Sequence, residues 1–214
     1  MKGKLIVLEG LSAAGKNTQS RKLVDRLKAS GKKAELVIFP DYGSPVGKLI
    51  AQYLAGKLGN KEDLVEKACL LYAVDRYDHA ERIRKLLKQG VFVVADRYSP
   101  SNYAFQGALV KNQQALWNWI DGLESLLPKP DRVLFLDVPR RVTSGLYRKR
   151  VPKNSLTKKD IHENDAPFEG RVYRNYVRLC KRNGYKRVGC VENGKLLPPD
   201  HIHQKVWSAL SGII

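Results

Sequence analysis

A glycine-rich stretch, GLSAAGKNTQ at residues 10–19, holds the residues best suited to chemistry. It satisfies the pattern G-x-x-x-x-G-K, it follows the apolar run LIVLE, and it leads into a helical pattern. Gly10 and Gly15 permit a tight turn whose backbone N–H groups point inward. The helix that begins near Lys16 adds its positive dipole end, and the Lys16 ammonium would reach phosphate oxygens. The stretch therefore predicts a phosphate-binding loop, and the alternative is a glycine turn that binds nothing.

Asn17 departs from the usual form of such loops, in which a Ser or Thr after the Lys supplies a hydroxyl ligand to magnesium. An amide carbonyl oxygen is a weaker ligand for a hard cation, but Thr18 follows and carries a hydroxyl. The order GKNTQ resembles the GKGTQ of adenylate kinases, whose residue after Lys also lacks a hydroxyl. We therefore expect the loop to bind phosphate while phosphate oxygens and water hold most of the metal.

Two predicted strands end in aspartate, at Asp96 and at Asp137. Asp96 is followed at once by Arg97, and an acid beside a metal together with an arginine beside a phosphate suits phosphoryl transfer. We therefore expect Asp96 to help hold Mg²⁺, partly through water. The alternative for Asp96 and Arg97 is an ordinary ion pair at a strand end. For Asp137, which precedes Val138 and Pro139, the alternative of a helix start is at least as good.

The apolar pattern along the chain indicates an α/β protein. Short, nearly continuous apolar runs alternate with longer helical patterns, which is typical of a parallel sheet covered on both faces. The predicted strands are 4–9, 34–39, 91–95, 132–138 and 186–191. The predicted helices are 16–30, 45–57, 62–89, 111–126, 139–149, 167–182 and 199–211. We expect a doubly wound, five-stranded parallel sheet in one domain over 1–214.

Composition and charge narrow the class of protein further. The 214 residues are 43% hydrophobic and contain no apolar run long enough to cross a bilayer, so we expect neither a membrane partner nor a signal peptide. Three cysteines without metal-site spacing favour a reducing, cytoplasmic location. The net charge of +18 would attract polyanions such as nucleotides or nucleic acid, and the alternative is solvated Lys and Arg on helix faces. The polar segment 149–167 reads as a mobile lid.

Several longer motifs together resemble the thymidylate kinase family of P-loop nucleoside monophosphate kinases. The resemblance covers nearly the whole chain, and the combination of FPxxxxPxG, DRYxxSxxAxQG and LPKPDxVLFLDV is specific. The stretches that carry it are LEGLSAAGKNTQ (8–19), FPDYGSPVGKLI (39–50), LLYAVDRYDH (70–79), DRYSPSNYAFQGA (96–108), LPKPDRVLFLDV (127–138) and ENDAPFEGRVYRNY (163–176). The resemblance implies transfer of the γ-phosphoryl group of ATP to dTMP, with Mg²⁺ as cofactor.

The resemblance also implies roles for particular residues. Arg97 would hold the acceptor phosphate, Tyr72 would stack on the thymine, and Arg76 would donate to its carbonyl edge; Tyr72 and Arg76 share one helix face. The alternative places Tyr72 in the core and Arg76 on the surface. The acceptor segment would span about 39–76. The residues implied to bind dTMP are Phe39, Pro40, Tyr42, Tyr72, Arg76, Arg97, Ser101, Gln106 and His162. Those implied to bind ATP are Gly10, Leu11, Ser12, Ala13, Ala14, Gly15, Lys16, Asn17 and Thr18, and Thr18 and Asp96 would hold the metal.

The lid, about 148–167, would complete the catalytic charge. The loop positions 12–14 are uncharged, so the resemblance assigns the remaining catalytic arginine to Arg148 or Arg150, beside Lys16, Asp96 and Arg97; the alternative is that the lid charges are simply solvated.

Two further departures from the family pattern lie on the acceptor side. Ser12 stands where family members usually carry an acid, and Tyr42 stands where an arginine often contacts the acceptor phosphate. The sequence therefore leaves open a kinase for another monophosphate, such as dUMP, a nucleoside kinase, or a catalytically weak nucleic-acid-binding protein. A homodimer through core helices is expected from the family resemblance.

Overall fold

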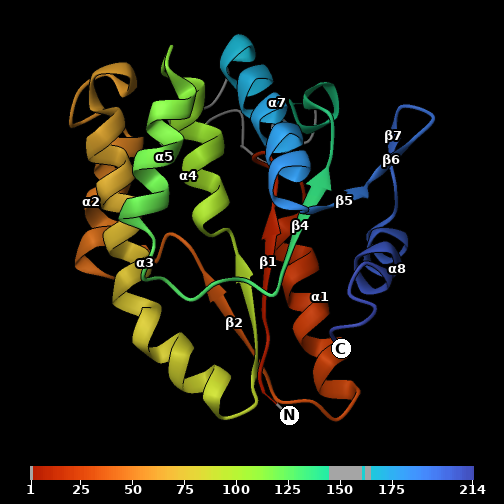
Figure 1. The fold of residues 1–214 in the computed structure, drawn as a ribbon. Helices are drawn as coiled ribbons and strands as arrows, with labels where there is room; N and C mark the ends of the chain where they lie inside the picture. Colours follow the sequence, from red (N-terminus) through yellow and green to blue (C-terminus); the bar gives the residue numbers. More distant parts are fainter. Residues whose placement is uncertain (1, 145–160, 162–164) are drawn as a thin grey trace.

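A computed structural model describes residues 2–144, 161 and 165–214. Its centre is a five-stranded parallel sheet with strand order β2-β3-β1-β4-β5. The strands are β1 (Leu5–Glu9), β2 (Ala34–Ile38), β3 (Phe92–Asp96), β4 (Arg132–Asp137) and β5 (Lys186–Gly189). Helices cover both faces of the sheet, as the sequence pattern predicts, so the doubly wound α/β fold is confirmed (Figure 1).

The helices follow the strands in the alternating order expected of this fold. The α-helices are α1 (Lys16–Ala29), α2 (Pro45–Leu54), α3 (Val65–Lys88), α4 (Ser99–Phe105), α5 (Gln113–Leu123), α7 (Ala166–Asn183) and α8 (Pro199–Ser208). Two short 3₁₀ turns, η1 (Lys61–Leu64) and η2 (Gln106–Ala108), extend α3 and α4, and a small hairpin pairs β6 (Val191–Glu192) with β7 (Lys195–Leu196).

The position of the central strand β1 explains why its sequence is almost continuously apolar. Successive side chains of a strand point to opposite faces of the sheet. Ile6 and Leu8 join the cluster under α1 and α8, whereas Leu5 and Val7 join the cluster under α3. Because both faces are covered, the strand needs apolar residues at every position, and its terminal Glu9 is the exception.

Most predicted elements lie within a few residues of the observed ones, but α4 and the β6–β7 hairpin do not appear among the predictions. The α4 helix is only 7 residues long and has Pro100 in its first turn, so it contains too few residues to show a helical period. Most of the predicted lid lies outside the described residues. Among the described residues, no helix combines the length and the low polarity needed to cross a membrane.

Candidate functional site

The phosphate-binding loop connects the carboxyl end of β1 to α1, in the centre of the sheet. Three of its residues have positive φ: Gly10 (155°), Ala13 (58°) and Gly15 (86°). A Cβ on Gly10 would lie 3.1 Å from the carbonyl oxygen of Leu136, so a side chain there meets both strain and crowding. The loop therefore curls tightly at the edge where parallel sheets bind their ligands.

Lys16 lies under this loop rather than in solvent. Its side chain is buried, and its Nζ donates to the carbonyl oxygens of Gly10 at 3.2 Å and Leu11 at 2.8 Å. These contacts hold the ammonium at the centre of the loop. A phosphate chain that enters the loop would meet this charge together with the backbone N–H groups at the start of α1.

Asp96, at the end of β3, has the environment that a water-mediated metal ligand needs. Its side chain is buried, yet it makes no hydrogen bond or ion pair with another described residue. Thr18 is exposed at the start of α1, and the Oδ1 of Asn17 accepts from Arg21 at 3.1 Å. The described residues contain no cluster of three acidic, His or Cys side chains that would hold a metal alone. The donor set therefore suits Mg²⁺ that arrives with nucleotide phosphates and keeps part of its water shell.

Arg97 begins the loop after β3 with a φ of 68°, in the left-handed region that non-glycine residues seldom adopt. Its Nη1 donates to the carbonyl oxygen of Gly10 at 3.1 Å and to the Oγ of Ser101 at 3.2 Å, and its guanidinium lies 5.1 Å from the ring centroid of Phe105. Burial opposes its charge, but nearby Tyr176 and Glu9 hold the pKa of Arg97 above its ordinary value. The guanidinium therefore stays positive beside the phosphate-binding loop.

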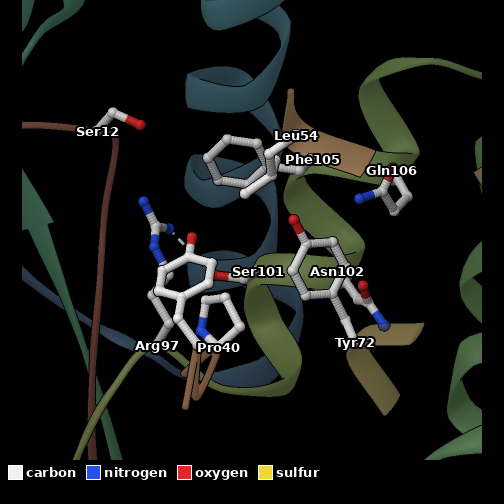
Figure 2. A pocket seen from close by; sticks show the side chains of 10 residues that line it. Ser12, Pro40, Leu54, Tyr72, Arg97, Ser101, Asn102, Phe105 and Gln106 are labelled. Atoms are coloured by element: carbon white, nitrogen blue, oxygen red, sulfur yellow. Dashed lines mark hydrogen bonds between the residues drawn. The ribbon is translucent and has the colours of Figure 1, made fainter. Parts of the chain in front are cut away.

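A pocket opens beside Arg97, and it gathers residues from the loop, α2, α3 and α4. Figure 2 shows Ser12 and Arg97 on the left and Asn102 and Gln106 on the right, with the Tyr72 ring between them. Ser101, Asn102, Phe105 and Gln106 project from one face of α4 and η2, as their spacing requires. The residues that line the pocket are Ser12, Pro40, Tyr42, Leu54, Tyr72, Arg97, Ser101, Asn102, Phe105 and Gln106.

Arg76 lies behind this pocket instead of on its wall. It is 1% exposed and forms a direct ion pair with Glu124, which also accepts from Asn102 Nδ2 at 2.7 Å. Asn102 Nδ2 donates to the carbonyl oxygen of Cys69 as well, so the orientation of its amide is fixed. Four buried atoms of this region have no hydrogen-bond partner among the described residues: Arg76 Nε, Asn102 Oδ1, Gln106 Oε1 and Glu124 Oε2. Two of them, Asn102 Oδ1 and Gln106 Oε1, are acceptors on residues that line the pocket, where a polar ligand could satisfy them.

Phe39 also lies behind the pocket, where it is 4% exposed and packs against Tyr98. The next residues, Pro40 and Tyr42, do reach the pocket. Asp75 fixes this segment because its carboxylate accepts from the backbone N–H of Asp41, while burial raises the pKa of Asp75. The structure thus brings together Ser12, Pro40, Tyr42, Tyr72, Arg97, Ser101 and Gln106 and places Phe39 and Arg76 one layer back. Arg148, Arg150 and His162 lie outside the described residues.

Sequence reasoning did not single out several residues of the site. Asn102 and Phe105 lie within DRYSPSNYAFQGA, and a helical reading of that stretch would have put them on the face of Ser101 and Gln106. Glu9 and Tyr176 contact the Arg97 network from β1 and α7. The only local signal for Glu9 is a charge at the end of an apolar strand, and Tyr176 gives no local signal.

Comparisons with known proteins agree with this geometry. The family model for thymidylate kinase matches residues 8–193. The human thymidylate kinase is 44% identical over 180 residues, which cover 84% of this chain and 78% of the human protein. A Bradyrhizobium diazoefficiens thymidylate kinase is 32% identical over 98% of this chain and 89% of its own length. A solved thymidylate kinase from Candida albicans superposes with a TM-score of 0.72 at 28% identity, covering 98% and 91% of the two chains.

A parallel sheet with a phosphate-binding loop at its centre and a polar pocket beside that loop defines a P-loop nucleotide kinase. The matches narrow this class: the chain belongs to the thymidylate kinase family. It is an ATP-dependent enzyme that phosphorylates dTMP, and no comparison favours a nucleoside kinase or a nucleic-acid-binding protein.

Proposed function

We propose that the chain transfers the γ-phosphoryl group of ATP directly to the 5′-phosphate of dTMP, with ATP on the loop of residues 10–18 and dTMP in the pocket beside Arg97. The observation that carries this assignment is a shared contact. Lys16 Nζ and Arg97 Nη1 both donate to the carbonyl oxygen of Gly10, at 3.2 and 3.1 Å. The cation expected on the donor side and the cation expected on the acceptor side therefore lie within two hydrogen-bond lengths of each other.

This convergence supports in-line transfer without a covalent enzyme intermediate. The transferred group spreads negative charge over its equatorial oxygens, and fixed cations on both sides stabilise that charge. The acceptor is already an anion, so no general base is required. The lid would add Arg148 or Arg150 and exclude water, and His162 would touch the nucleotide. Asp96 and Thr18 would help hold Mg²⁺, partly through water, and the bound ion would supply neutralisation of phosphate charge.

The unpartnered atoms of Asn102 and Gln106 on the pocket wall, and of Arg76 behind it, support selectivity for thymine or uracil. Thymine presents N3–H as a donor and O4 as an acceptor. Asn102 Oδ1 and Gln106 Oε1 are acceptors that suit the donor, and Arg76 Nε is a donor that suits the carbonyl. Cytosine presents the reverse order and would leave buried groups unpaired, which costs about 1–3 kcal/mol per group. Tyr72 supplies an aromatic face for the base.

The test is a steady-state comparison of dTMP, dUMP, dCMP and thymidine as acceptors, with ATP and Mg²⁺ held constant. We expect dTMP to give the highest kcat/KM, with dCMP at least about 10-fold lower because its base edge is mismatched. Thymidine should be inactive because Arg97 needs a phosphate to bind. Equal rates with dTMP and dCMP would contradict the assignment of the base pocket. Turnover of thymidine would contradict the role of Arg97.

We also propose that the chain forms a homodimer and that it is located in the cytoplasm. Leu49, Leu70 and Val74 expose 39–44% of their surface on α2 and α3, beside an apolar groove lined by Tyr53 and Leu64. A second copy of the chain that covers this face would bury the groove. The three cysteines are buried free thiols, which suits the reducing cytoplasm.

A further inference from the structure

Glu9 is a fully buried carboxylate at the end of the central strand β1. It ends the strand Leu5–Glu9, whose other four residues are apolar, and its own exposed fraction is 0%. Burial of an ionised carboxylate is costly unless hydrogen bonds and a nearby positive charge compensate it. The groups that contact the buried Glu9 carboxylate should therefore show what compensates its burial.

Three donors converge on Glu9, two from the start of α4 and one from α7. Its Oε1 accepts from the backbone N–H of Tyr98 at 2.8 Å. Its Oε2 accepts from the Oγ of Ser101 on α4 and from the Oη of Tyr176 on α7, each at 2.8 Å. Burial raises the pKa of Glu9 while the charge of Arg97 lowers it, and burial keeps the Tyr176 phenol neutral because its pKa is well above the ordinary value.

The same two hydroxyls also hold Arg97. Arg97 Nη1 lies 3.2 Å from the Oγ of Ser101 and 3.5 Å from the Oη of Tyr176, and the two hydroxyls lie 3.2 Å apart. Between the described side chains of Glu9 and Arg97 there is no direct ion pair. Their charges act on each other across the hydroxyls, so Glu9 occupies only the side of the guanidinium that carries Nη1.

The backbone around Arg97 gives a second link to Glu9. The φ of 68° at Arg97 costs conformational energy in a non-glycine residue and persists only where neighbouring contacts enforce it. The bond from the Tyr98 N–H to Glu9 fixes the peptide that immediately follows Arg97. Glu9 thus constrains both the main chain and the side chain of Arg97, while Nη2 and Nε make no hydrogen bond to other described residues.

We infer that Glu9 is a positioning residue for the transfer reaction: through Ser101 and Tyr176 it orients the Arg97 guanidinium so that Nη2 and Nε face the acceptor phosphate. Glu9 lies behind Arg97 and does not itself line the pocket. This inference rests on the proposed function, because the role of Arg97 toward the acceptor phosphate is part of that proposal.

The central experiment compares Glu9→Gln with the wild type. Glutamine keeps the shape and one acceptor for the Tyr98 N–H, but it removes the charge and replaces an acceptor by a donor opposite both hydroxyls. We expect the KM and the calorimetric Kd for dTMP to rise about 10- to 100-fold, as loss of a charged hydrogen-bond network predicts, while the KM for ATP changes less than about twofold. A purely structural role would weaken both substrates together and would overturn the inference.

A matched pair of tyrosine variants separates positioning from packing. Tyr176→Phe removes a buried hydroxyl that touches both Glu9 and Arg97, whereas Tyr103→Phe removes one that donates to Asp121 at 2.7 Å, away from Arg97. We expect Tyr176→Phe to weaken dTMP binding and Tyr103→Phe to leave it unchanged. Equal effects of the two variants would overturn the inference.

A double-mutant cycle closes the test. Glu9→Gln in an Arg97→Lys background should cost less than in the wild type, because the oriented fork is already gone. Full additivity would overturn the positioning role. A wild-type enzyme that binds dTMP without turning it over would instead contradict the proposed function, so the two failures can be told apart.

Discussion

Two arginine–glutamate pairs serve the acceptor pocket, one fully buried and one with a partly buried arginine, and they are built differently. Arg76 and Glu124 form a direct ion pair with side-chain exposures of 2% and 3%. Arg97 and Glu9 are joined through two hydroxyl groups, and Arg97 lines the pocket. The direct pair uses Nη2 of Arg76 behind the pocket, whereas the bridged pair uses Nη1 of Arg97 and leaves Nη2 and Nε of that guanidinium without hydrogen bonds to other described residues. The difference separates an arginine held to shape the base end of the pocket from one presented to a phosphate.

The largest expected effect is on folding, from breaking the direct pair. Arg76→Met would leave Glu124 charged and buried beside Asn102, which typically costs about 3–5 kcal/mol. The measurement is the free energy of unfolding by urea. The double variant Arg76→Met/Glu124→Leu removes both charges and should recover most of that loss, although selectivity against dCMP should fall. A single variant as stable as the wild type would show that the pair is not desolvated.

The second effect is on catalysis, from altering the bridged pair. Arg97→Lys keeps the charge but loses the planar fork, so we expect kcat/KM for dTMP to fall about 10²- to 10³-fold, as when an oriented transition-state donor is removed. Stability should change by less than about 1 kcal/mol because no buried charge loses its counter-charge. Arg82→Lys, at an exposed ion pair with Glu35, is the control. If Arg97→Lys lowered stability without lowering kcat/KM, Arg97 would serve the fold and not the acceptor phosphate, contrary to the comparison between the pairs.

The residues at the phosphate end of the site can be predicted from the sequence better than those at the base end. Gly10, Gly15 and Lys16 are neighbours along the chain, and local turn chemistry requires their types, so their positions follow from a short motif. Arg97 follows from its place after a strand that runs beside β1. The base end depends on Arg76, Asn102 and Glu124, which are far apart in sequence and meet only when α3, α4 and α5 pack together.

The sequence also does not predict which acceptor-side residues line the pocket and which lie behind it. Helical spacing puts Tyr72 and Arg76 on one face of α3, as observed, but it does not reveal that Glu124 draws Arg76 back from the pocket wall. Likewise, a strand-end charge such as Glu9 shows in the sequence, while its partners come from α4 and α7. Contacts between distant segments decide which charge is presented to the ligand and which supports it.

The smallest expected effect concerns the pH dependence of stability. Burial raises the pKa of Glu9 above its ordinary value of 4.5, so the folded state takes up a proton at a higher pH than the unfolded state does. The contribution of the protonated Glu9 carboxyl group to the free energy of unfolding is fully present below pH 4.5. It is lost as the pH rises through the pKa of Glu9 in the folded state. Relative to Glu9→Gln, the wild type should therefore become more stable as the pH falls toward 4.5.

Urea unfolding of both proteins across that pH range gives the difference directly, because titrations common to both cancel. Glu124→Gln provides the contrast for the direct pair, since its loss of stability at neutral pH should exceed that of Glu9→Gln: the Arg76 charge would lose its direct partner, whereas Arg97 keeps Tyr176, Ser101 and the carbonyl oxygen of Gly10. If the difference for Glu9→Gln instead grew as the pH rose, the carboxylate would be stabilised in its charged form. That result would contradict a raised pKa for Glu9.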